Sequence, residues 1–351
     1  MSKTKLPPEA LAQLAAVTDG ALRVGPLQGI PGLLRDLGQD PLRVFAAAEL
    51  NPGLLDDAEG TIPFGALGRL MSQCVEHTGC PHFGLLLGQR TGLPALGLVG
   101  HLGQHSPDLG TALRSMFLHL HIHDRGAIPS LTVEHGCAVV GYTIYQPAAE
   151  ATAQIYDAAV AIANNILHTL HGPGWHLSEV LLARARPPDP EPYRKVFQAP
   201  VRFGADQSAV VFPAAWLAEP VPGANPNLLK EILDRIAAVE SMGGGDIAVQ
   251  VRRVLCNLLL RGQPTLDDVA QIFAIHRRTL NRRLRENGVT FRQLLDEVRR
   301  QRARQLLRDT ALPVLAIAET LGYADAPAFT RAFRRWSGTT PTAWRADRRR
   351  D

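Results

Sequence analysis

The stretch 265–287 reads TLDDVAQIFAIHRRTLNRRLREN, and the interpretation of the whole chain begins from its spacing. It opens on Thr265 and two aspartates, which is typical of a helix start: a hydroxyl caps free N–H groups, and the helix dipole favours negative charge there. Val269 and Phe273 are four residues apart and therefore share one helix face. The first half of the stretch thus predicts an amphipathic helix.

The second half, 276–287, predicts another helix after a short break. Leu280 and Leu284 again lie four apart, so the pattern indicates helix, tight turn and helix, with the apolar faces turned toward each other. The opposite face carries polar side chains at i, i+3, i+4 and i+7, namely Arg278, Asn281, Arg282 and Arg285. Guanidinium groups can grip guanine edges or phosphates and a carboxamide can pair with adenine, which suits this face to a major groove.

The same pattern returns further along the chain. IAETLGY at 317–323 matches VAQIFAI at 269–275 with an offset of 48. Four positions after the next turn match the first unit with an offset of 49, namely Phe329, Thr330, Arg331 and Phe333. Asp325 is a candidate helix cap, and Pro327 falls in the first turn, where its missing N–H costs nothing. The sequence therefore predicts two helix-turn-helix units.

A helical apolar stripe at 289–309 connects the two units, with Thr290 as its candidate cap. A helix of 18–20 residues is roughly 27–30 Å long. One turn of B-DNA is about 34 Å. We therefore expect a connecting helix that can place two reading helices in successive major grooves on one side of the duplex.

These runs resemble the C-terminal double helix-turn-helix domain of the AraC/XylS family of bacterial transcription regulators. The resemblance covers about 247–345 and includes AIHRRTLNRRL at 274–284, LGYADAPAFTRAFRRWSG at 321–338 and GTTPTAWR at 338–345. The part from about 27 to 240 resembles the arabinose-binding-type regulatory domain of one branch of that family, through TGCPHFGLLLGQR at 78–90 and PVRFGADQSAVVFPAAWLAEPVPGANPNL at 200–228. This second resemblance implies a ligand-sensing, dimerising α+β domain.

The charges of the chain are unevenly distributed. Residues 241–351 contain 21 of the 37 Lys+Arg residues, all of them arginine, and 11 of the 33 Asp+Glu residues, so this part carries +10 and the remainder −6. A basic module on a slightly acidic body is the electrostatic pattern of a nucleic-acid binder, although an arginine-rich solvated surface is the alternative for charge alone.

No apolar run approaches 18 residues and the N-terminus lacks a signal-peptide core, so we expect a cytoplasmic protein that does not enter a membrane.

The N-terminal part changes its period at 131–145 (LTVEHGCAVVGYTIY), where alternating apolar residues predict a β-hairpin that turns at His135 and Gly136. Further strands are expected at 176–185 and 209–212, with a loop at 186–193 between them. Helices are expected at 8–17, 30–37, 41–49, 64–78, 81–89, 108–121, 151–170 and 228–240, and a buried turn or short helix at 93–103.

The expected fold is therefore multidomain, with an α+β N-terminal regulatory domain followed by an all-α double helix-turn-helix domain. The expected limits are an N-terminal extension at 1–26, an effector-binding and dimerisation domain at 27–240, a flexible glycine-rich linker at 241–246 and the DNA-binding domain at 247–346.

The DNA contacts are predicted from the outward faces of the two reading helices. The residues expected to contact bases are Arg278, Asn281, Arg282, Thr330 and Arg331. Those expected to contact phosphates are His276, Arg277, Arg283, Arg285 and Arg334. Positions 326–328 carry no polar side-chain group, so we expect most sequence discrimination to come from the first unit. A solvated helix face is the competing interpretation.

Histidine and cysteine side chains offer candidates in the N-terminal domain. His101, His119 and His123 are candidate effector ligands, because His119 and His123 are four apart and could share a carboxylate or a metal ion; helix-end histidines facing water or lining a pocket are the plainer interpretation. Cys74, His77, Cys80 and His82 have ligand-like chemistry, but the family resemblance accounts for that run without a metal ion. We expect no metal and no cofactor.

We therefore expect a homodimeric, ligand-responsive DNA-binding regulator that is not an enzyme, since the sequence contains no GxSxG, P-loop or HExxH pattern. Its expected partners are double-stranded DNA, a small-molecule effector and RNA polymerase, and activation is the commoner mode in the family that it resembles. One alternative is a metal-sensing or enzymatic N-terminal domain fused to a DNA-binding module. Another is a regulator that needs no effector.

Overall fold

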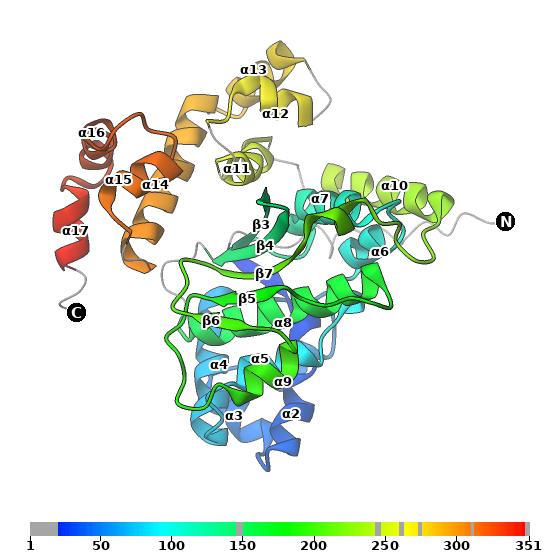
Figure 1. The fold of residues 1–351 in the computed structure, drawn as a ribbon. Coiled ribbons are helices and arrows are strands. Elements are labelled where there is room, and N and C mark those ends of the chain that lie inside the picture. Colours follow the sequence, from blue (N-terminus) through cyan, green and yellow to red (C-terminus); the bar gives the residue numbers. More distant parts are fainter. Residues whose placement is uncertain are drawn as a thin grey trace. The chain divides into compact units, whose positions relative to one another are not determined.

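The computed structural model divides the chain into two compact units, residues 1–244 and 245–351 (Figure 1). The structure describes residues 20–144, 150–242, 247–259, 263–272, 276–309 and 312–347. The helix expected at 8–17 and residues 243–246 of the expected linker lie outside these ranges. Ser241 and Met242, the first two residues of that expected linker, still belong to a helix, so the linker prediction began too early.

Unit 1 contains a five-stranded sheet, in the order β3-β4-β7-β5-β6. Its strands are β3 (Ala127–Glu134), β4 (Cys137–Ile144), β5 (Glu179–Leu182), β6 (Val201–Phe203) and β7 (Ser208–Pro213). All neighbours are antiparallel except β5 and β6. The predicted hairpin is confirmed: β3 pairs with β4, and His135 and Gly136 turn the chain with φ of 50° and 77°.

Helices cover this sheet and fill the rest of unit 1. They are α2 (Ile30–Asp36), α3 (Pro41–Ala47), α4 (Phe64–Thr78), α5 (Phe83–Gln89), α6 (Leu98–Gln104), α7 (Leu109–His119), α8 (Thr152–His171), α9 (Glu191–Phe197) and α10 (Pro226–Met242). A 3-10 turn, η4 (Leu120–Ile122), directly follows α7. The long helix α8 packs on β4 and β7 of the sheet (Figure 1). Among the described residues, no helix is long and apolar enough to cross a membrane.

Two parts of unit 1 differ from the sequence-based expectation. The loop predicted at 186–193 is wrong from Glu191 onward, because α9 begins there and buries Tyr193 and Phe197. The N-terminal segment holds a short strand, β1 (Ala21–Arg23), which pairs with β2 (Thr61–Pro63) and is buried along its length. The domain limit predicted at residue 27 therefore falls within a buried segment.

Glycines allow α5 to approach α8 at backbone distance. A Cβ atom on Gly84 would collide with the carbonyl oxygen of Gln154, and one on Gly88 would collide with that of Ala158. The Gln154 side chain reinforces the contact, because its Oε1 accepts from the Gly84 N–H (2.8 Å) and its Nε2 donates to the Pro81 carbonyl (2.8 Å). Helix α8 is thereby held against α5 with no room for side chains between the backbones.

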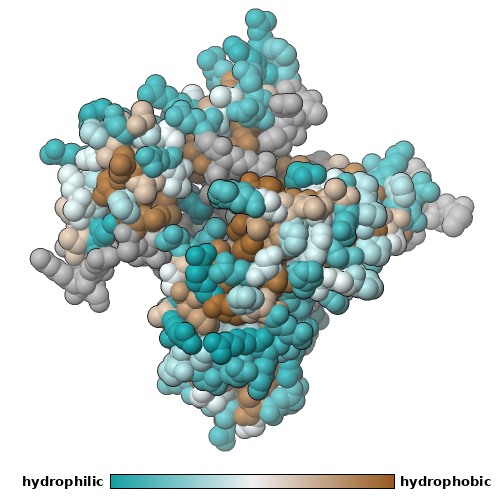
Figure 2. Space-filling view, in the orientation of Figure 1, coloured by the Kyte–Doolittle hydropathy of each residue, from teal (hydrophilic) through white to brown (hydrophobic). Residues whose placement is uncertain are grey.

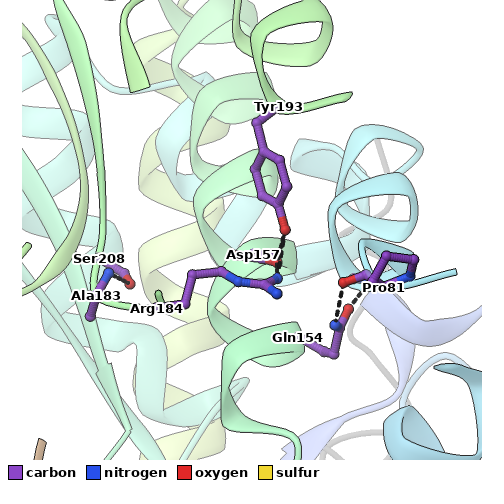
Figure 3. A network of polar contacts seen from close by, with 8 residues as sticks. Pro81, Gln154, Asp157, Ala183, Arg184, Tyr193 and Ser208 are labelled. Carbon is purple, nitrogen blue, oxygen red and sulfur yellow. Dashed lines mark hydrogen bonds and ion pairs between the residues drawn. The ribbon is translucent and has the colours of Figure 1, made fainter. Parts of the chain in front are cut away.

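A buried polar network ties α8 to α9 and to Arg184, which follows β5 (Figure 3). The Asp157 carboxylate pairs with the guanidinium of Arg184 and accepts a hydrogen bond from the Tyr193 hydroxyl (2.7 Å). Burial raises the pKa of Asp157 to about 6, although the charge of Arg184 acts to lower it. The network joins α8, the residues after β5, and α9.

Unit 2 is entirely helical in its described residues, as predicted. Its helices are α11 (Ile247–Leu258), α12 (Leu266–Ile272), α13 (Arg277–Glu286), α14 (Phe291–Asp309), α15 (Val314–Thr320), α16 (Ala326–Ser337) and α17 (Pro341–Asp347). The buried apolar residues form two clusters. Helix α14 contributes Leu294 and Val298 to the first, with α11–α13, and Ala303 and Leu307 to the second, with α15 and α16.

The Asp157 network yields a prediction about stability. Asp157→Ala leaves the mostly buried Arg184 without its carboxylate, so we expect the free energy of unfolding to fall by about 3–5 kcal/mol. Tyr193→Phe removes one hydroxyl and keeps the ion pair, so it should cost about 1 kcal/mol. Urea denaturation of the two variants and the wild type measures both losses. Equal losses would contradict the larger contribution of the ion pair to the free energy of unfolding.

Candidate functional site

The first helix-turn-helix unit starts with the predicted cap. The Thr265 Oγ1 accepts from the N–H of Asp268 (3.2 Å), and the Asp268 carboxylate accepts from the N–H of Thr265 (2.7 Å), which makes a reciprocal capping box. The Thr265 hydroxyl also donates to the Asp268 carboxylate (2.6 Å). This hydrogen bond, and then the one from the Thr265 backbone, lowers the pKa of the exposed Asp268. The start of α12 is therefore fixed by its own local sequence.

Helix α13 is capped by His276, whose Nδ1 accepts the backbone N–H of Arg278 at 3.2 Å. A neutral imidazole whose Nδ1 accepts must carry its hydrogen on Nε2. The exposed His276 ring thus has a donor left over at the start of the helix, where the dipole also favours anions. This geometry is compatible with the phosphate contact expected for His276.

The inner and outer faces of α13 separate as the spacing predicted. Leu280 and Leu284 are completely buried. The exposed residues of the helix include Arg277, Arg278, Arg282, Arg283 and Arg285, while Asn281 is half-buried between them. Figure 2 shows a hydrophilic surface over this helix.

Two of these arginines have carboxylate neighbours. Arg277 lies 3.4 Å from Asp267, and Arg282 lies 3.7 Å from Glu286. Exposed ion pairs of this kind are worth less than about 1 kcal/mol. A phosphate or a base edge can therefore replace either carboxylate at small cost.

The second unit has the same plan but fewer polar groups at its start. Asp325 caps α16 by accepting the Ala328 N–H at 2.6 Å, and Phe329 and Phe333 are completely buried. Arg331 and Arg334 are exposed and Thr330 is half-buried. The first turn consists of Ala-Pro-Ala, which offers no hydrogen-bonding side chain to a base.

Helix α14 holds the second unit through polar contacts as well as apolar ones. The Nε of Arg299 donates to the Leu321 carbonyl oxygen at 3.0 Å, and its guanidinium lies 5.0 Å from the centre of the Tyr323 ring. Thr290 caps the start of this helix, as predicted, and Gln293 completes a capping box with it. Its 19 residues make it roughly 28 Å long, close to one turn of B-DNA at about 34 Å.

Unit 1 contains a cavity of about 150 Å³ between α7, α8 and the sheet. Apolar side chains form most of its wall; those from α7 are Leu113, Met116 and Phe117, and those from α8 include Val160, Ile162, Ala163 and Leu167. The polar side chains of the wall are His123, Asp124, Tyr142 and Ser208. Such a pocket, mostly apolar with a few polar groups on one side, is the usual form of a small-molecule site.

The three histidines predicted to bind an effector lie in different places. His123 is 4% exposed and lines the cavity; burial and then the charge of Arg23 lower its pKa to about 3, so the ring is neutral. His101 is exposed and does not line the cavity. His119 contacts Glu240 instead.

The expected pairing of His119 with His123 does not occur. Helix α7 ends at His119, and the tighter turn η4 rotates the following residues away from the i, i+4 relation. His119 Nδ1 and His121 Nε2 both lie against Glu240 Oε1, at 3.0 and 3.1 Å. Burial alone would raise the pKa of Glu240, but the hydrogen bonds from the two histidines lower it to about 2. No local pattern in the sequence signals this contact, since Glu240 is 119 positions beyond His121.

The cysteines of the Cys74–His82 run belong to the core. Cys74 and Cys80 are buried, and burial raises the pKa of the Cys74 thiol to about 12, which keeps it protonated. Within the described part of the chain, no three His, Cys, Asp or Glu side chains are grouped closely enough to hold a metal ion.

Two family models match the chain. The arabinose-binding domain of AraC transcription regulators matches residues 38–221, and a helix-turn-helix domain matches residues 269–347. The HTH-type transcriptional regulator VirS of Mycobacterium tuberculosis is 26% identical over 331 residues, 93% of this chain and 96% of that protein. The ornithine utilization regulator of Pseudomonas aeruginosa is 29% identical over 319 residues, 89% of this chain and 93% of that protein.

A solved structure is also similar to the chain. The crystal structure of the transcriptional regulator CdpR from Pseudomonas aeruginosa has 25% sequence identity and a TM-score of 0.44. The match covers 89% of this chain and 97% of that chain.

The unequal faces of α13 and α16 yield a prediction about sequence selection. Arg282→Ala should reduce the preference for the target over a scrambled duplex, because each bidentate base contact is worth about 1–3 kcal/mol. Arg331→Ala should weaken binding to both duplexes more evenly. Fluorescence anisotropy with the two duplexes measures this, with Arg43→Ala, which removes an exposed arginine from unit 1, as the matched control. Loss of preference in Arg331→Ala with an even loss in Arg282→Ala would reverse the assignment.

Proposed function

This chain belongs to the AraC family of transcription regulators, and we propose that its first helix-turn-helix unit selects the DNA sequence while the second secures the phosphate backbone. It is a regulator with an N-terminal ligand-binding domain and a C-terminal helix-turn-helix DNA-binding domain, and the relatives named above are regulators rather than enzymes. The observation that carries the proposal is that α13 and α16, which occupy equivalent places in the two units, differ in the hydrogen-bond donors that they present. Helix α13 presents several donors on one side, and the first turn of α16 presents none.

The proposed base contacts are Arg278, Asn281 and Arg282 in α13, with Thr330 and Arg331 in α16. The proposed phosphate contacts are His276, Arg277, Arg283, Arg285 and Arg334. Four of these five are exposed arginines, and His276 has its Nε2 left over as a donor because Nδ1 caps the helix. Helix α13 shares a buried apolar cluster with the first half of α14, and α16 contacts α14 directly. The length of α14 is close to one helical turn of DNA, which supports binding in successive major grooves.

Binding should depend steeply on salt, because each neutralised phosphate releases counterions. The slope of log K against log salt is about −0.9 for each phosphate contacted in duplex DNA. Arg334→Ala should therefore make the slope shallower by about one and weaken binding to all sequences alike. DNase footprinting upstream of the neighbouring genes would locate the site, and anisotropy titrations at several salt concentrations would give the slopes. A wild-type slope near zero would count against the whole interface.

We further propose that an effector in the unit 1 cavity controls DNA binding. A ligand can act only through different affinities for two arrangements of the DNA-binding units. The segment of α7 and η4 lines the cavity with Met116, Phe117 and His123, and the same segment contacts Glu240 through His119 and His121. Helix α10, which carries Glu240, is the last helix of unit 1 and ends at Met242. A ligand that changes the position of α7 and η4 would therefore also act on α10, whose end precedes the DNA-binding domain.

The remaining parts of the proposal follow from the family. We propose that the chain acts in the cytoplasm as a homodimer held by its N-terminal domains, and that it activates transcription by contacting RNA polymerase. The buried, protonated Cys74 thiol gives no support to the alternative of a metal-sensing N-terminal domain.

Replacing Glu240 tests the proposed route. Glu240→Gln removes the carboxylate that both histidines contact, so we expect faster hydrogen exchange at the C-terminal end of α10 and a smaller DNA response to any ligand of the cavity. Glu231→Gln, an exposed position on the same helix, is the matched control. Unchanged exchange in Glu240→Gln would rule out the contact as a restraint on α10.

The same contact predicts a pH dependence. The pKa of Glu240 is lowered from 4.5 to about 2, so the contact stabilises unit 1 above pH 4.5, and this stabilisation is lost as the pH falls from 4.5 toward 2. Denaturant unfolding between pH 3 and 6 should show the loss in the wild type and a flatter profile in Glu240→Gln. Parallel profiles for the two proteins would contradict the assignment.

A further inference from the structure

The cavity of unit 1 allows its ligand to be described by chemical class. We propose that it binds an uncharged, mostly apolar molecule of about the size of a substituted benzene ring, which places one hydroxyl or carbonyl group against Nδ1 of His123. This inference rests on the proposed function, because it assigns the effector site of the regulator to this cavity. It goes further by excluding charged effectors and naming the side chain that recognises the polar group.

The volume and the lining of the cavity indicate the size and the apolar character of most of the ligand. An apolar cavity of about 150 Å³ is large enough for benzene, and the volume here is about 150 Å³. Its lining includes Leu113, Met116, Val160, Ala163 and Leu167 from α7 and α8, together with apolar side chains from other elements. An apolar molecule bound there would gain van der Waals contacts with these side chains.

The polar part of the ligand is set by His123. Its side chain lines the cavity, and its Nδ1 is buried without a hydrogen-bond partner among the described residues. A buried polar atom without a partner is unfavourable, so a ligand that supplies the partner gains affinity. The ring is neutral, and in either tautomer Nδ1 can bond to a hydroxyl group, which both donates and accepts. A carbonyl group serves the tautomer that carries hydrogen on Nδ1.

The charges in the wall exclude ionic ligands. Asp124 lies beside His123 in the lining, and the described lining residues include no lysine or arginine. An anionic ligand would therefore be repelled by this carboxylate and would meet no lysine or arginine among the described lining residues. The Asp124 oxygens already accept from the Tyr142 hydroxyl (2.5 Å) and from the N–H groups of Gly126 (2.8 Å) and Ala127 (3.2 Å). An ammonium group would thus lose its hydration in a mostly apolar wall whose carboxylate oxygens already accept three hydrogen bonds.

Four probes of one ring size separate these contributions. We expect phenol to bind the full-length protein in calorimetric titrations, toluene to bind roughly tenfold more weakly, and benzoate and benzylamine at neutral pH to bind more weakly still. Binding of benzoate or benzylamine as tight as that of phenol would overturn the assignment of an uncharged ligand. Failure of both phenol and toluene to bind would overturn the site itself.

Two variants locate the binding within the cavity. His123→Phe keeps a ring but removes Nδ1, so the affinity for phenol should fall roughly tenfold, to the level of toluene, while toluene still binds. Retained toluene binding shows that the variant is folded, and unchanged phenol affinity in it would overturn the role of His123. Ala163→Phe adds a ring to the α8 wall and should abolish the binding of both probes.

A DNA-binding measurement on the same wild-type preparation separates failure of the proposed ligand class from failure of the proposed function. If phenol does not bind but the duplex does, the ligand class is wrong and the DNA-binding function stands. If the duplex does not bind, the proposed function itself fails, whatever the outcome with phenol.

Discussion

The packing of one helix into two separate apolar cores is the constraint on which the DNA-binding unit depends. The first half of α14 supplies Leu294 and Val298 to the core of the first helix-turn-helix, and its second half supplies Ala303 and Leu307 to the core of the second. Because an α-helix is stiff over this length, the distance along it between the two cores is set by residue count alone. Inserting or deleting residues in α14 would change both that distance and the rotation of one core against the other.

The two helix-turn-helix units also show which of their residues are constrained by folding and which are not. Both keep a capped first turn and two apolar residues four apart on the inner face, since each short helix needs them to stay folded. The outward residues carry no such requirement. Asn281 is matched by Thr330, and the arginines at 277 and 278 are matched by Ala326 and Pro327, so the folding pattern was retained while the polar surface changed.

Regular spacing explains how much could be predicted from the sequence. The two helix-turn-helix units, the connecting helix, the β3–β4 hairpin and α8 all follow from local periodicity and capping residues, and the structure confirms them. Strand β6 and the start of α9 could not be predicted in this way, because β6 has only three residues and the Tyr193 hydroxyl of α9 has its partner, Asp157, on another helix. The same limit applies to the site. His123 was a candidate from its sequence neighbours, whereas Asp124, Tyr142 and Glu240 meet their partners only through the tertiary fold.

The two glycines that bring α5 against α8 have a consequence for how the regulatory domain can change over evolution. Gly84 and Gly88 leave no space between those helices, so α8 is a fixed wall of the cavity, and its residues can change only by altering the cavity volume. The part of the wall from α7 presents the flexible methionine Met116 and the partly buried Phe117. Homologous chains that have specialised on other ligands should therefore differ mostly along α7, while the glycines and the backbone of α8 stay as they are.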